Sequence, residues 1–108
     1  MRTEFVKYLL ERLVGDQILD RGDAVLCVCA GTAEREVFAG LGFTNVTISN
    51  LDERMTPGSF APFAWSFEDA QKLSYDDGAF DVVFVADGLH HCSSPHLALT
   101  EMYRVARK

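Results

Sequence analysis

The chain has 108 residues, of which 48% are hydrophobic, and carries a net charge of −6 at pH 7. This length predicts one domain, and the acidic balance argues against a nucleic-acid partner or a membrane surface, because phosphate recognition needs Lys and Arg. No apolar run approaches the ~18 residues of a membrane span, and the N-terminus lacks the pattern of a secretion signal. Three cysteines, two of them in an apolar run, are typical of free thiols and predict a cytoplasmic protein.

Residues 3–19 are predicted to form a helix, followed by a turn into a strand. The apolar residues of this helix fall at i, i+4 spacing in two adjacent rows, which together make a stripe of helical width. The rows are Phe5, Leu9 and Leu13, and Val6, Leu10 and Val14. We therefore expect this helix to cover one face of a sheet.

Residues 23–34 have the pattern of a buried strand that ends in a small-residue turn and leads into a helix. Val25, Leu26 and Val28 are strand formers in a nearly continuous apolar run. Residues 30–33 then carry almost no side-chain bulk. A strand, a tight loop and a helix N-terminus commonly hold the anionic or polar part of a nucleotide-like ligand. The alternative interpretation is a plain structural turn.

The later segments alternate between strands and helices or long connections. Strands are expected at residues 45–49, 63–67 and 80–86, and a short helix at 33–41. Ser94 and Pro95 have the pattern of an N-cap and first residue of a last helix. The expected apolar face of that helix is Ala98, Leu99, Met102, Tyr103 and Ala106. This order of elements predicts an open parallel sheet with helices on its faces.

Polar or small residues follow each of the four predicted strands, at residues 29–33, 50–52, 69–70 and 86–92. In such a sheet, ligands bind across the carboxyl ends of the strands. Asn50 and Asp52 lie 19 and 21 positions after Gly31, which matches the ~20-residue offset of a side chain that meets a ribose hydroxyl.

Four blocks of this sequence, in order, resemble class I S-adenosylmethionine-dependent methyltransferases of type 11. Residues 25–33, VLCVCAGTA, are similar to the family's VLDVGCGTG, and Asn50-Leu51 takes the place of its acidic residue after the second strand. Asp69-Ala70 with residues 73–81 resembles the family's DAxxLPFxDxSFD. Residues 89–91 (LHH) and 98–105 resemble its LHH and its AL, E and RV positions.

The resemblance implies a Rossmann-like, doubly wound, mostly parallel α/β sheet in three α/β/α layers. The chain would cover it up to the fourth strand and the helix that follows. Residues 1–22 would be an N-terminal helix and turn, and residues 23–108 the cofactor-binding core of a single, incomplete methyltransferase domain. The fourth strand would then be an apolar edge, and we expect self-association or a partner chain to cover it.

The resemblance also implies S-adenosyl-L-methionine as cofactor and S-adenosyl-L-homocysteine as product. The loop expected against its methionine and ribose parts is Cys29, Ala30, Gly31, Thr32 and Ala33. Asn50 is expected at the ribose hydroxyls, and Leu51 beside the adenine.

Two further strand ends complete the implied cofactor site. Asp69 is expected to bind the adenine amine, and Ala70 to line the adenine pocket. Ala86 and Asp87 are expected near the methionine end and the transferred methyl group. The implied reaction is methyl transfer to a small-molecule acceptor, which such enzymes achieve largely by placing the nucleophile in line with the methyl. The resemblance assigns no catalytic residue.

The sequence departs from the family pattern at four positions of this site. Cys27 replaces the first acidic residue, Cys29 and Ala33 replace two loop glycines, and Asn50 replaces the ribose carboxylate. Side chains at loop glycines obstruct positive φ and close approach of a ligand. Loss of one charged hydrogen bond costs about 1.5–3 kcal/mol, which is roughly a ten- to hundredfold loss of affinity. We therefore expect weakened cofactor binding, with Asp52 as a substitute acid.

Several alternatives remain open at this point. His90 and His91 are either substrate-side groups, one a general base, or loop residues that shape the start of the helix. Cys29, His90, His91 and Cys92 have zinc-ligand chemistry but lack paired-ligand spacing, so no metal site is predicted. The alternative functions are a non-catalytic interaction domain and a nicotinamide-dependent oxidoreductase, although residues 30–34 lack the full GxGxxG.

Overall fold

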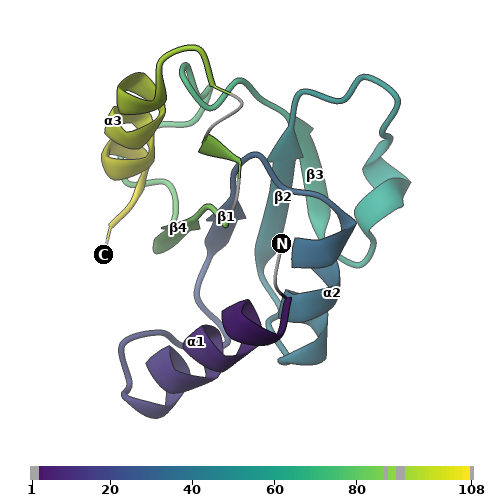
Figure 1. Cartoon of the computed structure of the whole chain (residues 1–108), viewed down its shortest axis with the longest axis vertical. Coiled ribbons are helices and arrows are strands. Elements are labelled where there is room, and N and C mark those ends of the chain that lie inside the picture. The colour runs from purple at the N-terminus through teal and green to yellow at the C-terminus, as the bar shows by residue number, and fades with distance from the viewer. Residues whose placement is uncertain (1–2, 87, 90–91, 108) are drawn as a thin grey trace.

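The computed structural model describes residues 3–86, 88–89 and 92–107 (Figure 1). The predictions for Asp87, His90 and His91 therefore fall outside the described residues. The elements follow in this order: α1 (Thr3–Gly15), β1 (Val25–Cys27), α2 (Thr32–Gly40), β2 (Val46–Asn50), the 3-10 helix η1 (Pro57–Phe60), β3 (Ala64–Phe67), β4 (Val82–Phe84) and α3 (Pro95–Val105).

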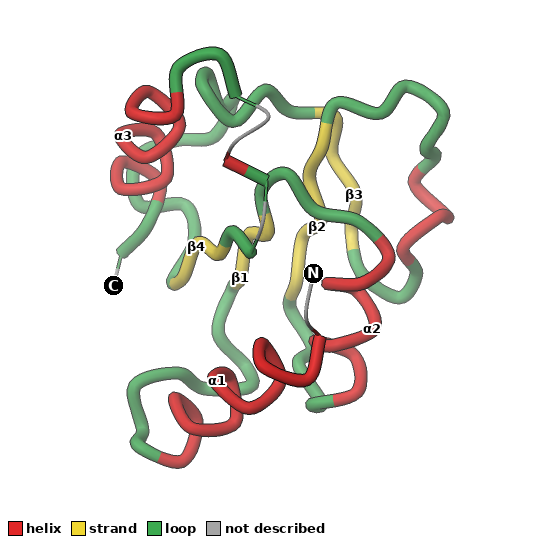
Figure 2. The backbone as a smooth tube through the Cα atoms, in the orientation of Figure 1, coloured by secondary structure: helices red, strands yellow, loops and turns green. Residues whose placement is uncertain are grey.

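The four strands form one parallel sheet in the order β3-β2-β1-β4. Val25 of β1 lies opposite Val46 of β2 on one side and Val82 of β4 on the other. Because the strands are parallel, their carboxyl ends meet at one edge of the sheet, and the loops that follow them gather there (Figure 2). The predicted Rossmann-like parallel sheet is confirmed.

Helices cover both faces of this sheet, which confirms the three predicted layers (Figure 1). Val25, Cys27 and Ile48 point into a core that they share with α1 and α2. Leu26 and Val28, the alternate residues of the central strand and its extension, point into a second core under α3. The continuous apolar run at residues 25–28 is thus explained by burial on both faces of a central strand.

The last strand is shorter than the sequence predicts, with three residues in place of seven. Phe80 pairs with Ala106 after α3: its N–H donates to the Val105 carbonyl at 3.0 Å, and its carbonyl accepts from the Arg107 N–H at 2.8 Å. Phe80 is therefore held by the chain at the end of α3, whereas the next residue, Asp81, already donates to the Ala24 carbonyl beside β1 at 2.9 Å. Such a contact between distant segments leaves no local signal in the sequence.

The predicted length and apolar width of the first helix are wrong in part. Only Val6 and Leu10 are buried, whereas Phe5 is 63% exposed and Leu9 40% exposed. The row that contains Val6 and Leu10 therefore faces the core, together with Leu13 from the end of the other row, which is partly buried against it. The helix ends at Gly15, and Gln17 follows with a left-handed φ of 63°, a conformation that terminates helices.

The apolar face of α3 also differs from the prediction. Leu99 and Tyr103 are exposed, and Ala98, Met102 and Val105 are the buried residues. The buried row follows i, i+4, i+7 spacing, and the predicted face lacks Val105.

The longest helix of the described residues, α1 with 13, is far shorter than the ~20 residues that cross a bilayer, and no helix in this part of the chain could span a membrane.

β4 forms one edge of the sheet, since β1 is its only strand neighbour among the described residues. Its side chains are half-buried. Together with α1 and the loop after it, they line an apolar groove of about 280 Å³. The sheet therefore has an open apolar edge next to α1.

Candidate functional site

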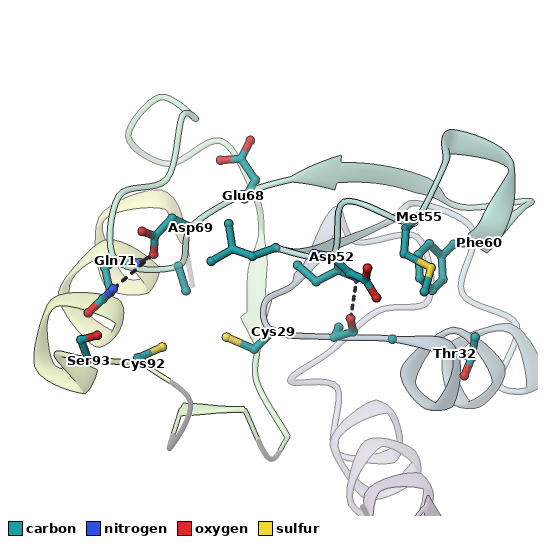
Figure 3. A pocket seen from close by; sticks show the side chains of 15 residues that line it. Cys29, Thr32, Asp52, Met55, Phe60, Glu68, Asp69, Gln71, Cys92 and Ser93 are labelled. Atoms are coloured by element: carbon teal, nitrogen blue, oxygen red, sulfur yellow. Dashed lines mark hydrogen bonds between the residues drawn. The ribbon is translucent and has the colours of Figure 1, made fainter.

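A pocket of about 750 Å³ lies at the carboxyl edge of the sheet (Figure 3). Four segments form its wall: the loop after β1, the end of β2 with the chain behind it, the chain after β3, and the residues before α3. The lining residues are Cys29, Ala30, Gly31, Thr32, Asn50, Leu51, Asp52, Met55, Phe60, Glu68, Asp69, Ala70, Gln71, Cys92 and Ser93. Open parallel sheets bind their ligands at this edge.

Most of the predicted site residues meet at this pocket. Those that line it are Cys29, Ala30, Gly31, Thr32, Asn50, Leu51, Asp69 and Ala70. Ala33 and Ala86 are not among its lining residues. Ala33 is the second residue of α2, and Ala86 is exposed beyond β4. Asp87 lies outside the described residues.

The loop after β1 is held by backbone and side-chain hydrogen bonds. The Ala30 N–H donates to the Ser49 carbonyl at 3.0 Å, which ties the loop to the end of β2. Gly31 caps α2, and its N–H donates to Oε1 of the buried Glu34 at 3.0 Å, as in one half of a capping box. The N-terminus of α2, whose free N–H groups favour negative or polar ligand atoms, therefore faces the pocket in a fixed position.

Asn50 connects three parts of the site. Its Nδ2 donates to the Ala30 carbonyl at 2.9 Å, and its Oδ1 accepts from the Trp65 indole at 3.2 Å and from the Asp52 N–H at 3.0 Å. A carboxylate cannot donate to a carbonyl, so this arrangement requires an amide where the family pattern has an acid. One hydrogen of Nδ2 is left for a ligand.

Asp52 lines the pocket, but its carboxylate is already bound. Oδ1 accepts from the Arg54 N–H at 3.0 Å and from Nε at 2.9 Å, while Oδ2 accepts from NH2 at 2.9 Å. Hydrogen bonds from Arg54 lower the pKa of Asp52. Whether the Asp52 carboxylate can accept from a ribose hydroxyl therefore depends on the position of the Arg54 side chain, which is 87% exposed.

Two neighbouring acids after β3 have different surroundings. The buried Glu68 accepts from both Ser66 and Ser74, with the shortest bond, 2.7 Å, from the Ser74 hydroxyl. Asp69 Oδ1 accepts from the Gln71 N–H at 2.9 Å (Figure 3). Asp69 Oδ2 has no partner within the described residues, so this oxygen is available to a ligand. Glu68 holds the turn, and Asp69 faces the pocket.

The sequence predictions missed several wall residues. They are Met55, Phe60, Glu68, Gln71 and Ser93. Met55 and Phe60 come from the irregular segment around η1, where no periodicity indicates a direction. The only signal for Gln71 and Glu68 was their position next to Asp69-Ala70. In the sequence, Cys92 stands out only by its zinc-ligand chemistry. Across residues 3–86, 88–89 and 92–107, no three His, Cys, Asp or Glu side chains gather around a metal position.

The two cysteines of the β1 segment lie in different surroundings. Cys27 is fully buried in the core that faces α1 and α2, and burial raises the pKa of its thiol. Cys29 lines the pocket, and burial followed by the charge of Cys92 raises its pKa to about 11. Cys27, at the position of the family's first acid, thus packs in the core, while Cys29 contributes to the ligand pocket.

Comparison with known proteins supports the same interpretation. Residues 24–108 match the model of a family described as a methyltransferase domain. The chain belongs to this family. The methyltransferase chain is 34% identical, over 98 residues, to the ubiquinone/menaquinone biosynthesis C-methyltransferase UbiE of Neisseria meningitidis. The match covers 86% of this chain and 39% of that relative, so the chain spans well under half the length of the curated relatives it matches.

Solved structures share the fold of this methyltransferase chain. A SAM-dependent methyltransferase from Aquifex aeolicus superimposes with a TM-score of 0.68 at 22% identity, over 89% of this chain and 57% of that one. The [4+2]-cyclase SpnF superimposes with a TM-score of 0.74 at 23% identity, over 93% of this chain and 40% of that one. One of these neighbours is named for an activity other than methyl transfer, so the likeness establishes the fold alone.

Proposed function

We propose that the pocket at the carboxyl edge binds S-adenosyl-L-methionine and that the whole protein transfers its methyl group to a small-molecule acceptor. The main support for this proposal is that three of the sequence blocks that resemble the family line the same pocket. The loop after β1, Asn50-Leu51 and Asp69-Ala70 all line it, in a chain whose residues 24–108 match the methyltransferase domain family.

The residues of the pocket fit the parts of this cofactor. The loop from Cys29 to Thr32 holds the methionine and ribose parts, aided by the N-terminus of α2. Leu51, which is 55% exposed and lines the pocket, offers an apolar surface to the adenine ring. Asp69 Oδ2 accepts from the adenine amine, and the small Ala70 leaves room for the ring.

When bound, the sulfonium of the cofactor supplies an electrophilic methyl group. The residues of this chain hold the donor in a fixed orientation, and the acceptor then attacks in line with the methyl. No catalytic residue is assigned to the described part of the chain. Because the matched curated relatives are named for C-methylation in ubiquinone and menaquinone biosynthesis, a quinone precursor is the first acceptor to assay with the whole protein. A cytoplasmic location remains part of this proposal.

Titration of the folded chain with three ligands tests the proposal. S-adenosylmethionine and S-adenosylhomocysteine are expected to raise the melting temperature in a saturable way, because a ligand that binds only the folded state stabilises it. NAD is expected to have no effect. Trp65, the only tryptophan, donates to Asn50 at the end of β2, so its fluorescence gives a second measure of binding.

A matched pair of variants makes the titration specific. Asp69→Ala removes the pocket carboxylate, and Asp16→Ala removes a surface carboxylate that pairs with Arg12 on α1. We expect weaker binding only for Asp69→Ala. Stabilisation by NAD would favour the oxidoreductase, and a folded chain that binds none of the three ligands would favour a non-catalytic interaction domain.

A further inference from the structure

Two thiols from distant parts of the chain face each other across the pocket. Cys29 follows β1, and Cys92 precedes α3; both line the pocket, and their sulfur atoms point toward one another (Figure 3). Both are free and partly accessible, whereas Cys27 is free and fully buried. The pocket therefore contains a pair of reachable thiols, with the third cysteine of the chain sequestered from them.

The backbone holds Cys29 in this position. Its φ is 51°, a left-handed conformation that L residues rarely adopt. Gly88 lies directly against it, since a Cβ on Gly88 would be 2.2 Å from the Cβ of Cys29. The pocket loop thus contacts the chain between β4 and Cys92, and only a glycine allows this approach.

Hydrogen bonds on the other side hold Cys92. Its N–H donates to the Leu89 carbonyl at 3.0 Å, and the Ser94 N–H donates to Gln71 Oε1 at 2.6 Å. These bonds fix the segment before α3 against the chain after β3. The backbone on both sides of the thiol pair is therefore held by contacts of its own, and Gly88-Leu89 touches both sides.

The thiols also interact electrically. After burial, the largest causes of the raised pKa of Cys29 are the charge of Cys92 and a hydrogen bond with its side chain. The charges of Asp69 and Glu34 act in the same direction. The two thiols therefore lie close enough to influence each other electrostatically, in agreement with the sulfur atoms that face each other in Figure 3.

We propose that Cys29 and Cys92 form a redox-active dithiol, which low-molecular-weight disulfides convert to an intramolecular disulfide across the cofactor pocket. One of the two thiols loses its proton and attacks one sulfur of the small disulfide, which forms a mixed disulfide and expels one thiolate. The facing thiol gives its proton to that thiolate and attacks the protein sulfur of the mixed disulfide, which expels the second thiolate; this takes up the proton that the first thiol had released. Two protein thiols are oxidised, and one small disulfide is reduced to two thiols.

The consequence for cofactor binding rests on the proposed function. Cys29 lies in the loop assigned to the methionine part of S-adenosylmethionine, so a disulfide there occupies the space of the methyl donor. The oxidised chain is closed to the cofactor, and reduction of the disulfide opens it again.

Oxidation of the reduced 108-residue chain with glutathione disulfide tests the dithiol directly. We expect the intact mass to fall by about 2 Da, the loss of two hydrogens, and the thiols titratable in denaturant to fall from three to one. Tryptic digestion should link residues 22–35 to residues 73–104, and fragmentation should place the link at Cys29. Dithiothreitol should reverse every change, and the reaction should accelerate as the pH rises, because the thiolate is the attacking form.

Matched variants decide which thiols react. Cys29→Ser and Cys92→Ser should each abolish the mass loss, whereas Cys27→Ala should retain it. Stable glutathione adducts without a bridge, a bridge through Cys27, or bridges only between chains would overturn the proposal.

Cofactor binding is then measured on both redox forms. Binding of S-adenosylhomocysteine by the reduced form and at least tenfold weaker binding by the disulfide form supports closure of the pocket. Equal binding by both forms overturns closure. Disulfide formation in a chain that binds no cofactor in either form contradicts the proposed function and leaves the dithiol assignment intact.

Discussion

Cys29 combines a left-handed backbone, a side chain in the pocket and contact with Gly88. Glycine adopts this conformation without strain, so Cys29→Gly should relieve it and clear space for the cofactor. We expect S-adenosylmethionine affinity to rise about tenfold, which corresponds to about 1.4 kcal/mol, in isothermal titration. Cys92→Ala is the control, because it removes the facing thiol and leaves the φ of Cys29 unchanged. Unchanged or weaker binding by the glycine variant would contradict this account of the loop.

Asn50 gives a second prediction at the scale of a residue. Asn50→Asp restores the family's acid but loses the donor to the Ala30 carbonyl and places a negative charge beside it. A buried carbonyl that loses its donor, or is repelled by a charge, costs about 1–3 kcal/mol of the free energy of unfolding. We expect urea denaturation to show a loss of this size. Asn45→Asp makes the same chemical change at an exposed site and should be nearly neutral. Equal effects of the two substitutions would show that the Ala30 bond contributes nothing.

These two residues show where sequence reasoning stops. The spacing from Gly31 correctly places Asn50 at the end of the second strand and at the pocket. Its bonds to Ala30 and Trp65 join residues 20 and 15 positions away, and nothing local to residue 50 indicates them. The sequence also singles out Cys29 and Cys92, but only the folded chain brings their sulfurs face to face.

At the scale of an element, α3 holds the chain between β3 and β4. Arg104 donates to Glu101 at 2.8 Å, to Asp77 at 2.7 Å and to the carbonyls of Leu73 and Tyr75. Glu101 also accepts from the Leu73 N–H at 2.9 Å. Two charged residues of the family pattern thus form a structural clamp.

This clamp predicts a pH-dependent stability. The hydrogen bond from Arg104 lowers the pKa of Glu101 below its usual value of 4.5, so ionised Glu101 contributes stability above that pH and loses it as the pH falls further. Urea unfolding should show Glu101→Gln to be less stable than the parent at pH 7, with the difference shrinking below about pH 4.5. Glu36→Gln, at an exposed site on α2, is the control. A difference that is constant with pH would contradict the clamp.

The sequence predicts whether a segment is a helix or a strand better than it predicts which of its residues are buried and where the segment ends. The apolar run at residues 80–86 correctly indicates a strand near that position, but Phe80 pairs instead with the chain after α3. Likewise, α1 and α3 both bury apolar residues at helical spacing, but part of each predicted apolar face is exposed: Phe5 and Leu9 on α1, and Leu99 and Tyr103 on α3. Which row packs depends on where the helix lies on the sheet, and periodicity alone does not contain that information.

At the scale of the whole molecule, the open β4 edge predicts self-association of the 108-residue chain. The apolar groove beside it is lined in part by Leu9 of α1, and a second copy could cover it. Sedimentation velocity should show a concentration-dependent dimer that Leu9→Lys weakens. Phe5→Lys places the same charge on an exposed residue of α1 that does not line the groove and should leave the dimer intact. A monomer at all concentrations, or equal effects of the two variants, would contradict self-association through the groove.

The central claim is that S-adenosylmethionine binds at the carboxyl edge of the sheet. At 108 residues, the chain is small enough for residue-by-residue NMR titration with S-adenosylhomocysteine. We predict saturable shifts of the amide resonances of Gly31, Leu51 and Ala70, with those of α1 and the C-terminal turn of α3 unchanged. Shifts confined to the groove between α1 and β4, or no saturable shift in a folded sample, would contradict the account.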